Sequence, residues 1–170
     1  VTDVGSTKAS VVASARAALG EKFARFVPGH PIAGTEHSGA QAAFAELYVG
    51  HRVILTPVAE TDTDALICVR AMWETAGARV AQMSVADHDR VLAATSHLPH
   101  MLAFTLVDML AAASDADDIF AFAAGGFRDF TRIASSNPEM WRDIALANRD
   151  ALLEICGAYN ARLERLMQAL

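Results

Sequence analysis

The pattern of hydrophobic residues changes once along this chain, near Ser84, and this change constrains the fold more than any other feature. Before it, short segments of β-branched or alternating apolar residues are separated by segments with helical spacing. After it, no strand pattern recurs. Strands that alternate with helices are typical of a mostly parallel α/β sheet, whereas successive helices are typical of an all-α domain. We therefore predict a mainly α chain, with an α/β part over residues 1–83 and a helical part over 84–170.

Local signals predict the elements of the first part. Ser6 can cap a helix over 7–19, and Gly20 would end it. The expected strands are 23–27, 52–56 and 79–83. Helices are expected at 40–47 and 62–76, and residues 29–39, with three glycines and a proline, are expected to form a loop.

The second part opens with a Ser-x-x-acid capping signal at Ser84 and Asp87. The expected helices are 87–95, 97–113, one that opens at Asn137-Pro138, and a last one up to Leu170. Apolar residues of the last helix lie on one face. That face favours packing within the chain, with an interface between two chains as the alternative.

Composition excludes several classes of protein. The net charge is −6 and the charges are dispersed, so a nucleic acid is not an expected partner. The longest apolar-rich stretch, 101–113, contains Thr105 and Asp108 and is too short to cross a bilayer, so no membrane partner is expected. We interpret the two cysteines, Cys68 and Cys156, as reduced thiols, which is typical of a cytoplasmic protein.

His30 is the first candidate for chemistry. It lies between Gly29 and Pro31, just after a predicted strand. Ligands of open α/β sheets bind at loops that follow strands, and a histidine can accept a proton near neutral pH. The residues alone leave two interpretations, a catalytic base or a turn residue whose ring binds a backbone carbonyl.

His97 and His100 lie three residues apart, so they share a face if the segment is helical. They could bind a metal with Asp89, line a pocket for a carboxylated substrate, or serve as buried hydrogen-bond donors. The spacing matches no common zinc motif and a third ligand is not evident. We therefore expect no metal here.

The third candidate is the segment 125–132, which begins with Gly125-Gly126. Paired glycines permit close backbone approach or a left-handed turn. Arg128 and Arg132 are four residues apart, and an arginine can hold a carboxylate through two parallel hydrogen bonds. The alternative is a solvated helix whose arginines pair with neighbouring acidic side chains. The Gly-x-Gly-x-x-Gly signature of dinucleotide sites is absent from the sequence.

Four longer motifs occur in one order along the chain. They are Val-Thr-Asp-Val-Gly-Ser-Thr-Lys (1–8), Gly-His-Pro-Ile-Ala-Gly-Thr-Glu-His-Ser-Gly (29–39), Ser-His-Leu-Pro-His (96–100) and Gly-Gly-Phe-Arg-Asp-Phe-Thr-Arg-Ile-Ala (125–134), followed by Asn-Pro-Glu-Met-Trp-Arg-Asp (137–143). Together they resemble the prephenate, arogenate or cyclohexadienyl dehydrogenase family of tyrosine biosynthesis. The likeness covers essentially the whole chain, and several motifs in one order are far more specific than any one alone.

The resemblance implies the C-terminal portion of a Rossmann-like nucleotide-binding domain, followed by an all-α dimerisation domain. NAD or NADP would be the cofactor, and the protein would form a homodimer. Because the first residues resemble the end of a strand, we expect the sequence to be a fragment without the glycine-rich half of the nucleotide-binding domain.

The resemblance also implies the reaction. A hydride leaves C4 of prephenate for the nicotinamide, and loss of carbon dioxide gives 4-hydroxyphenylpyruvate; arogenate would give tyrosine. His30 matches the catalytic base, and Ser6 matches a serine that contacts the C4 hydroxyl and the nicotinamide. Arg132 matches the arginine that binds a substrate carboxylate. Further matches to the substrate pocket or its gate are His100, Gly125, Thr35, Glu36, Ser96, His97, Asp129 and Trp141, with Thr35 also near the cofactor.

Two further interpretations accompany this one. Tyrosine could act as a feedback inhibitor at the substrate pocket. The chain could also be a catalytically inactive fragment that serves as a helical dimerisation module.

Overall fold

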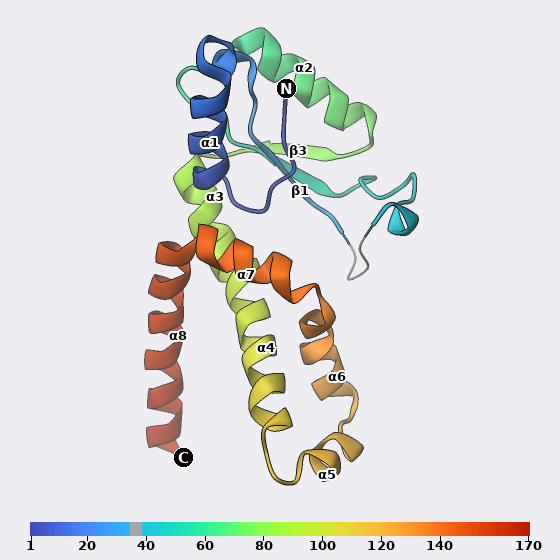
Figure 1. Ribbon diagram of the computed structural model, residues 1–170, viewed down its shortest axis with the longest axis vertical. Coiled ribbons are helices and arrows are strands. Elements are labelled where there is room, and N and C mark those ends of the chain that lie inside the picture. Colours follow the sequence, from blue (N-terminus) through green and yellow to red (C-terminus); the bar gives the residue numbers. More distant parts are fainter. Residues whose placement is uncertain (35–38) are drawn as a thin grey trace. The chain divides into compact units, whose positions relative to one another are not determined.

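The computed structural model describes residues 1–34 and 39–170, which divide into two compact units, Val1–Val91 and Leu92–Leu170 (Figure 1). The first unit holds a three-stranded sheet with helices, and the second holds helices throughout the described residues. This arrangement confirms the predicted mainly α fold. Within the described residues, none of the helices combines the length and apolar character that a membrane span requires.

The sheet has the order β1-β2-β3, with β1 at Gly29–Ile32, β2 at Arg52–Leu55 and β3 at Arg79–Gln82. β2 and β3 are parallel, as expected, but β1 and β2 are antiparallel. The prediction of a mostly parallel sheet is therefore correct for one of these two strand pairs and wrong for the other. Parallel strands need a long crossover, usually a helix. The helix α2, Thr63–Thr75, provides one between β2 and β3, whereas the described residues between β1 and β2 form only the short 3-10 turn η2, Ala40–Ala42.

Three predictions for the first unit are wrong. Residues 23–27 are not a strand, because the 3-10 helix η1, Gly20–Arg25, occupies most of them. Their apolar spacing instead buries Phe23 and Phe26 against Val12 of α1, Ala9–Leu19. The expected loop at 29–39 begins with β1, and the helix expected at 40–47 is reduced to η2.

The core of the first unit lies between the sheet and α2. Val53 and Leu55 of β2 pack with Val69 and Trp73 of α2, together with Val27 and Ala78. α2 begins and ends within one residue of its prediction, and Asp62 caps it by accepting a hydrogen bond from the backbone N–H of Ala65. The β-branched pattern of β2 was therefore a reliable strand signal, since all but its first residue are buried.

The Asp62 cap gives a stability prediction. Asp62→Ala removes the acceptor for the Ala65 N–H, at 2.8 Å, and is expected to lower the free energy of unfolding by about 1 kcal/mol. Urea denaturation would measure it. Asp62→Asn keeps an acceptor oxygen and serves as the matched control. An equal loss in both variants would contradict a role in capping.

The second compact unit begins with a helix interruption. α3, Val85–Leu92, is followed directly by a π turn, η3 at Ala93–His97, and then by α4, Leu98–Ala111. The two helices expected at 87–95 and 97–113 are thus joined by a π turn. Pro99 explains this geometry, because its ring would clash with the carbonyl four residues earlier in a regular α-helix.

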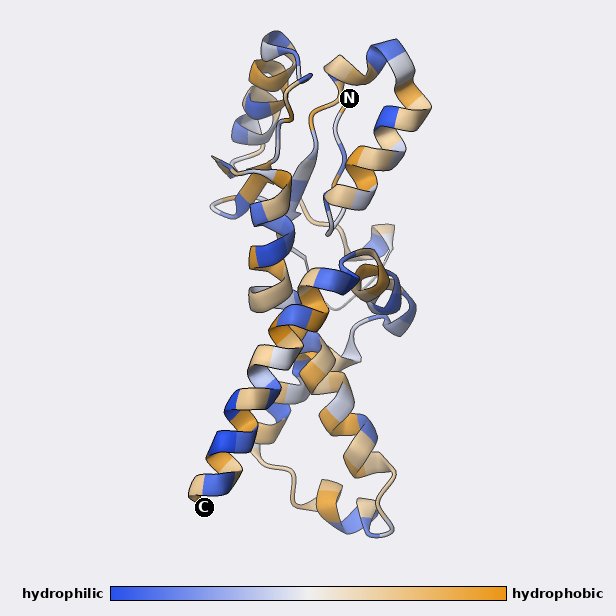
Figure 2. Ribbon diagram, turned by 90° about the vertical axis from the view of Figure 1, so that its left-hand side faces the viewer, coloured by the Kyte–Doolittle hydropathy of each residue, from blue (hydrophilic) through white to orange (hydrophobic). Residues whose placement is uncertain are grey.

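The remaining helices are α5 (Ala116–Ala121), α6 (Gly125–Thr131), the 3-10 turn η4 (Arg132–Ser135), α7 (Pro138–Ala147) and α8 (Arg149–Ala169). Asn137 caps α7 as expected, by accepting a hydrogen bond from the N–H of Met140. In α8, apolar and polar residues alternate along the helix (Figure 2). Of the apolar residues predicted to share one face of this helix, Leu152 is buried, whereas Leu163, Leu166 and Met167 are exposed. Packing within the described chain therefore does not cover the C-terminal part of that apolar face.

Candidate active site

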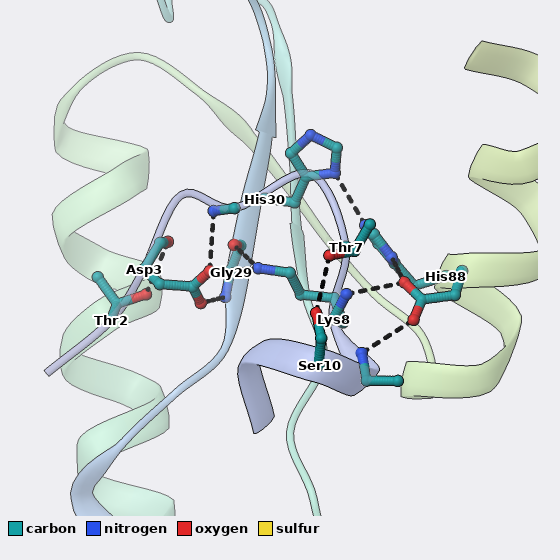
Figure 3. Close-up of polar contacts among 11 residues, drawn as sticks. Thr2, Asp3, Thr7, Lys8, Ser10, Gly29, His30 and His88 are labelled. Atoms are coloured by element: carbon teal, nitrogen blue, oxygen red, sulfur yellow. Dashed lines mark hydrogen bonds and ion pairs between the residues drawn. The ribbon is translucent and has the colours of Figure 1, made fainter. Parts of the chain in front are cut away.

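His30 lies in β1, opposite Ile54 of β2, and only 9% of it is exposed. Its Nδ1 is 2.8 Å from Nε2 of His88, and the two rings meet edge to face (Figure 3). The other nitrogen of the His30 ring, Nε2, faces away from His88. The interpretation of His30 as a turn residue bound to a backbone carbonyl is therefore wrong for Nδ1, because that atom binds another imidazole.

His88 is fully buried in α3 and connects His30 to a carboxylate. Its Nδ1 is 2.8 Å from Oδ1 of Asp89, which is itself 5% exposed. Three buried side chains thus form one hydrogen-bonded series, His30–His88–Asp89.

Asp89 also binds the start of α1. Its Oδ1 accepts a hydrogen bond from the backbone N–H of Lys8, and its Oδ2 accepts one from Ala9, both at 2.8 Å. Burial raises the pKa of the Asp89 carboxyl, but the hydrogen bonds from His88, Ala9 and Lys8 together lower it below its ordinary value. The predicted cap by Ser6 is wrong, because this carboxylate from α3 occupies the N-terminus of α1 instead.

Lys8 and Asp3 fix the backbone next to His30. The fully buried Lys8 forms an ion pair with Asp3 and donates a hydrogen bond to the carbonyl of Gly29 at 2.5 Å. Asp3 accepts one from the Gly29 N–H at 2.9 Å and another from Gly5 at 2.8 Å. Burial lowers the pKa of the Lys8 amine, and the bond and charge of Asp3 oppose that shift.

Gly29 fits this position because it lacks a side chain. A Cβ there would lie 3.1 Å from Oγ1 of Thr2 and 3.2 Å from the carbonyl oxygen of Asp3. Both backbone groups of Gly29 are already bound, to Asp3 and Lys8. The backbone position of Gly29, directly before His30, is therefore fixed by two hydrogen bonds and by close packing.

Ser6 lies in the turn between Gly5 and α1, on the segment that Asp3 and Lys8 tie to β1. Its side chain is half-buried, and its hydroxyl makes no hydrogen bond to the residues that the structure describes. The first unit therefore brings the segments of Ser6 and His30 together. Thr35 and Glu36 lie outside the described residues.

In the second unit, His100 stacks on Trp141, with 3.5 Å between ring centroids and 16° between ring planes. Its Nδ1 is 2.8 Å from the carbonyl oxygen of Ser96, so this nitrogen carries the proton and donates. Burial lowers the pKa of His100, the hydrogen bond to Ser96 raises it, and the charge of Arg132 lowers it further, with a net lowering. His100 is therefore neutral near neutral pH, and its Nε2 can accept a hydrogen bond.

His97 is buried and has different partners. Its Nδ1 is 3.1 Å from Nδ2 of Asn148. Its ring and that of Trp141 are T-shaped, with 6.1 Å between the ring centroids. The two histidines thus do not direct their Nδ1 atoms to one point. No group of three metal-binding side chains comes together among the described residues, Asp89 included.

Gly125 and Gly126 form the first turn of α6 rather than a left-handed turn. A Cβ at either glycine would meet nothing within 4 Å, so this helix end is sterically open. Asp129 and Arg128 are exposed on α6, and Arg132 begins η4. The left-handed interpretation of the glycine pair is wrong, whereas the open helix end leaves room for a ligand.

The sequence did not lead us to predict His88, Lys8 or Asp3 as site residues. Asp89 was considered only as a metal ligand. A signal for His88 and Asp89 exists, since the cap at Ser84 places both in the first two turns of a helix. Nothing local shows that this helix packs beside His30, because 58 residues separate the two histidines.

Comparisons with known proteins agree with these motifs. A model described as prephenate dehydrogenase, nucleotide-binding domain, matches residues 1–82, and one described as prephenate dehydrogenase, dimerization domain, matches 84–170. A cyclohexadienyl dehydrogenase of Zymomonas mobilis is 42% identical over 172 residues, covering 100% of this chain and 58% of that protein. A prephenate dehydrogenase of Bacillus subtilis is 43% identical over 155 residues, covering 91% and 42%.

Solved structures are similar as well. Prephenate dehydrogenase from Aquifex aeolicus, in complex with hydroxyphenyl propionate and NAD+, has a TM-score of 0.91 at 46% identity, covering 99% of this chain and 58% of that one. Synechocystis arogenate dehydrogenase has a TM-score of 0.81 at 34% identity, covering 99% and 60%. The chain thus spans 58% or less of the length of the two relatives named above. On the two family models and these identities, the chain belongs to the prephenate dehydrogenase family.

Proposed function

We propose that the full-length protein oxidises prephenate or arogenate with NAD or NADP, and that His30 is the catalytic base. One observation carries the proposal, which is that His30 is held by two further buried side chains in a chain of this family. A catalytic base needs a fixed position and a fixed tautomer more than it needs exposure. The series His30–His88–Asp89 can provide both.

Residues 1–83 would form the C-terminal part of the nucleotide-binding domain, and 84–170 the helical domain. The glycine fingerprint for the cofactor phosphates is not in this sequence. The nicotinamide end is a better fit, because Ser6 offers a half-buried hydroxyl that binds none of the described residues. We propose that Ser6, with Thr35, contacts the cofactor. NAD(P), when bound, accepts the hydride.

His30 would accept the proton of the C4 hydroxyl through Nε2, the nitrogen that faces away from His88. Removal of this proton favours departure of the hydride from C4. Ser6 would orient the same hydroxyl. A positioned base contributes about 100- to 10,000-fold to the rate, and the loss of carbon dioxide is driven by aromatisation of the ring.

The second unit would bind the substrate. Arg132 would bind a carboxylate, since its guanidinium can donate two parallel hydrogen bonds. Neutral His100, stacked on Trp141, could accept a hydrogen bond, and the open N-terminus of α6 at Gly125 could donate one. The remaining proposed pocket or gate residues are Thr35, Glu36, Ser96, His97 and Asp129.

Arg132 gives a prediction about affinity. Arg132→Ala in the full-length protein is expected to raise KM for prephenate by about 10-fold or more, because a charge-assisted hydrogen bond contributes about 1.5–3 kcal/mol. Steady-state kinetics would measure it. Arg128→Ala, one helical turn earlier and also exposed, is the matched control. A fall in kcat with an unchanged KM would contradict a role in binding.

The exposed apolar face of α8, which includes Leu163, Leu166 and Met167, favours a homodimer, in line with the dimerization domain that matches 84–170. The same face supports the second candidate function, a helical dimerisation module without catalysis. Sedimentation of this chain at micromolar concentration tests both, and a monomer would contradict them. Inhibition by tyrosine at the substrate pocket is a further proposal, tested by adding tyrosine to the assay.

The experiment that tests the proposed function is a steady-state assay of the full-length protein with each substrate and each cofactor. We expect reduced nicotinamide to form with prephenate or arogenate. Absence of turnover in all four combinations would contradict the proposed activity and favour the dimerisation module.

A further inference from the structure

The series His30–His88–Asp89 has one end at which only an acceptor is present. Asp89 is ionised and can only accept, and its Oδ1 is 2.8 Å from Nδ1 of His88. Nδ1 of His88 must therefore carry a proton. When His88 is neutral, its Nε2 has a lone pair and accepts from Nδ1 of His30, also at 2.8 Å. Nε2 of His30 then lacks a proton and can act as a base.

The second oxygen of Asp89 explains why the carboxylate stays in place. It accepts the N–H of Ala9, while Oδ1 accepts that of Lys8, so the carboxylate closes the N-terminus of α1. Helix N-termini stabilise negative charge. Ser6 comes two residues before Lys8, so the carboxylate that orients the histidines also holds the segment of Ser6.

The charged amine of Lys8 forms bonds with groups other than the Asp89 carboxylate. The side-chain amine of Lys8 binds Asp3 and the carbonyl of Gly29. Burial lowers the pKa of the Lys8 amine, while the bond and charge of Asp3 and the charge of Asp89 raise it. Lys8 and Asp3 form one ionic pair, whereas Asp89 accepts hydrogen bonds from His88 and from two backbone amides at the N-terminus of α1.

We propose that Asp89 and His88 are positioning residues, which fix His30 as the tautomer with its proton on Nδ1 and hold Ser6 and His30 in one register through the N-terminus of α1. This inference rests on the proposed function for the role of His30, but not for the tautomer itself.

The series His30–His88–Asp89, which we call the relay, also determines where the positive charge lies after proton transfer. When Nε2 of His30 accepts the hydroxyl proton, the proton on its Nδ1 can move to Nε2 of His88. His30 is then neutral with its proton on Nε2, and the positive charge lies on His88 beside the carboxylate of Asp89. No proton is gained or lost within the protein beyond the one taken from the substrate.

The tautomer can be measured without turnover. Nitrogen NMR of the full-length protein, with 15N-labelled histidine, distinguishes protonated from unprotonated ring nitrogens. The His30 signals are identified by their absence in His30→Asn. We expect Nδ1 of His30 to be protonated and Nε2 unprotonated in the free enzyme above the pH at which the ring is charged. A proton on Nε2 instead would overturn the proposal, whatever the activity of the enzyme.

Kinetics give a second test that does not depend on one variant. Asp89→Asn removes the negative charge of the carboxylate. It also replaces one accepting oxygen by an NH2 group, which would face the N–H donor of Lys8, Ala9 or His88. His88→Gln removes the link between the other two residues. In each we expect kcat to fall by about 100-fold or more, because loss of the aspartate that orients the catalytic histidine of a Ser–His–Asp triad costs about 10,000-fold. KM for the substrate should change little.

A pH profile separates positioning from mere stability. The Asp89 carboxylate favours the protonated, positively charged form of the two histidines, which cannot act as a base. In Asp89→Asn this form should persist only to a lower pH, so the fall of kcat on acidification should occur at lower pH than in the wild type. Asp87→Asn makes the same chemical change on the exposed side of α3 and should leave kcat and the limb unchanged. If His30→Asn is inactive while Asp89→Asn and His88→Gln keep the wild-type kcat, the relay is rejected and the proposed function stands. If His30→Asn is itself fully active, the catalytic role proposed for His30 fails instead.

Discussion

Replacement of His30 by asparagine in the full-length protein is expected to lower kcat by about 100- to 10,000-fold, the range that a positioned base contributes. Asparagine can keep a hydrogen bond to His88, but it cannot accept the hydroxyl proton near neutral pH. Steady-state kinetics measure the loss. Because asparagine preserves shape and polarity, the cofactor affinity and the unfolding midpoint should remain close to those of the wild-type protein.

The matched control is His51→Asn, which makes the same substitution at an exposed position just before β2. It should leave kcat unchanged. An unchanged kcat in His30→Asn would remove the catalytic role, and an equal loss in both variants would indicate a general effect of the substitution.

Substitution of Asp3 by alanine is expected to destabilise the first unit strongly. Asp3 pairs with the fully buried Lys8 and accepts the N–H groups of Gly5 and Gly29. Removing one partner of a buried ion pair costs about 3–5 kcal/mol, because the remaining charge loses the group it was paired with and is not hydrated in its place. Since Asp3 is 20% exposed, we expect a loss near the lower end, about 3 kcal/mol.

Denaturant unfolding of the full-length protein measures this loss. Asp143→Ala, which removes an exposed carboxylate paired with Arg142 on α7, is the control and should leave the unfolding midpoint nearly unchanged. Equal midpoints for Asp3→Ala and Asp143→Ala would show that the pair of Asp3 with Lys8 does not stabilise the fold.

Part of this fold follows directly from local sequence. The β-branched run of β2 and the capped, amphipathic segment of α2 were predicted within one or two residues, because burial and local propensity agree in both. β1 was missed, because Gly29 and Pro31 read as a turn. Pro31 is tolerated there because β1 is the first strand in the order of the sheet. Gly29 is favoured because a side chain there would be crowded by Thr2 and Asp3.

The site was only partly predictable for a related reason. His30 stood out because it occurs in a motif, although its residues alone left a turn and a base equally open. Its partner His88 is 58 residues away, and Asp89 caps a helix that begins 80 residues earlier in the chain. A Ser6 cap was the expected local solution at α1, but a tertiary carboxylate took its place. Contacts of this kind depend on the packing of α3, which no local pattern shows.

The central claim is that His30 is the base that accepts the substrate proton. The pH dependence of kcat/KM for prephenate, in the full-length wild type and in His30→Asn, tests it most directly. Histidine ordinarily changes charge between about pH 5 and 8, and only its neutral form is a base. We expect the wild-type activity to fall as the pH is lowered through this range, and the low residual activity of His30→Asn to show no such fall. The same acid limb in both proteins would contradict the claim, because another group would then be the base.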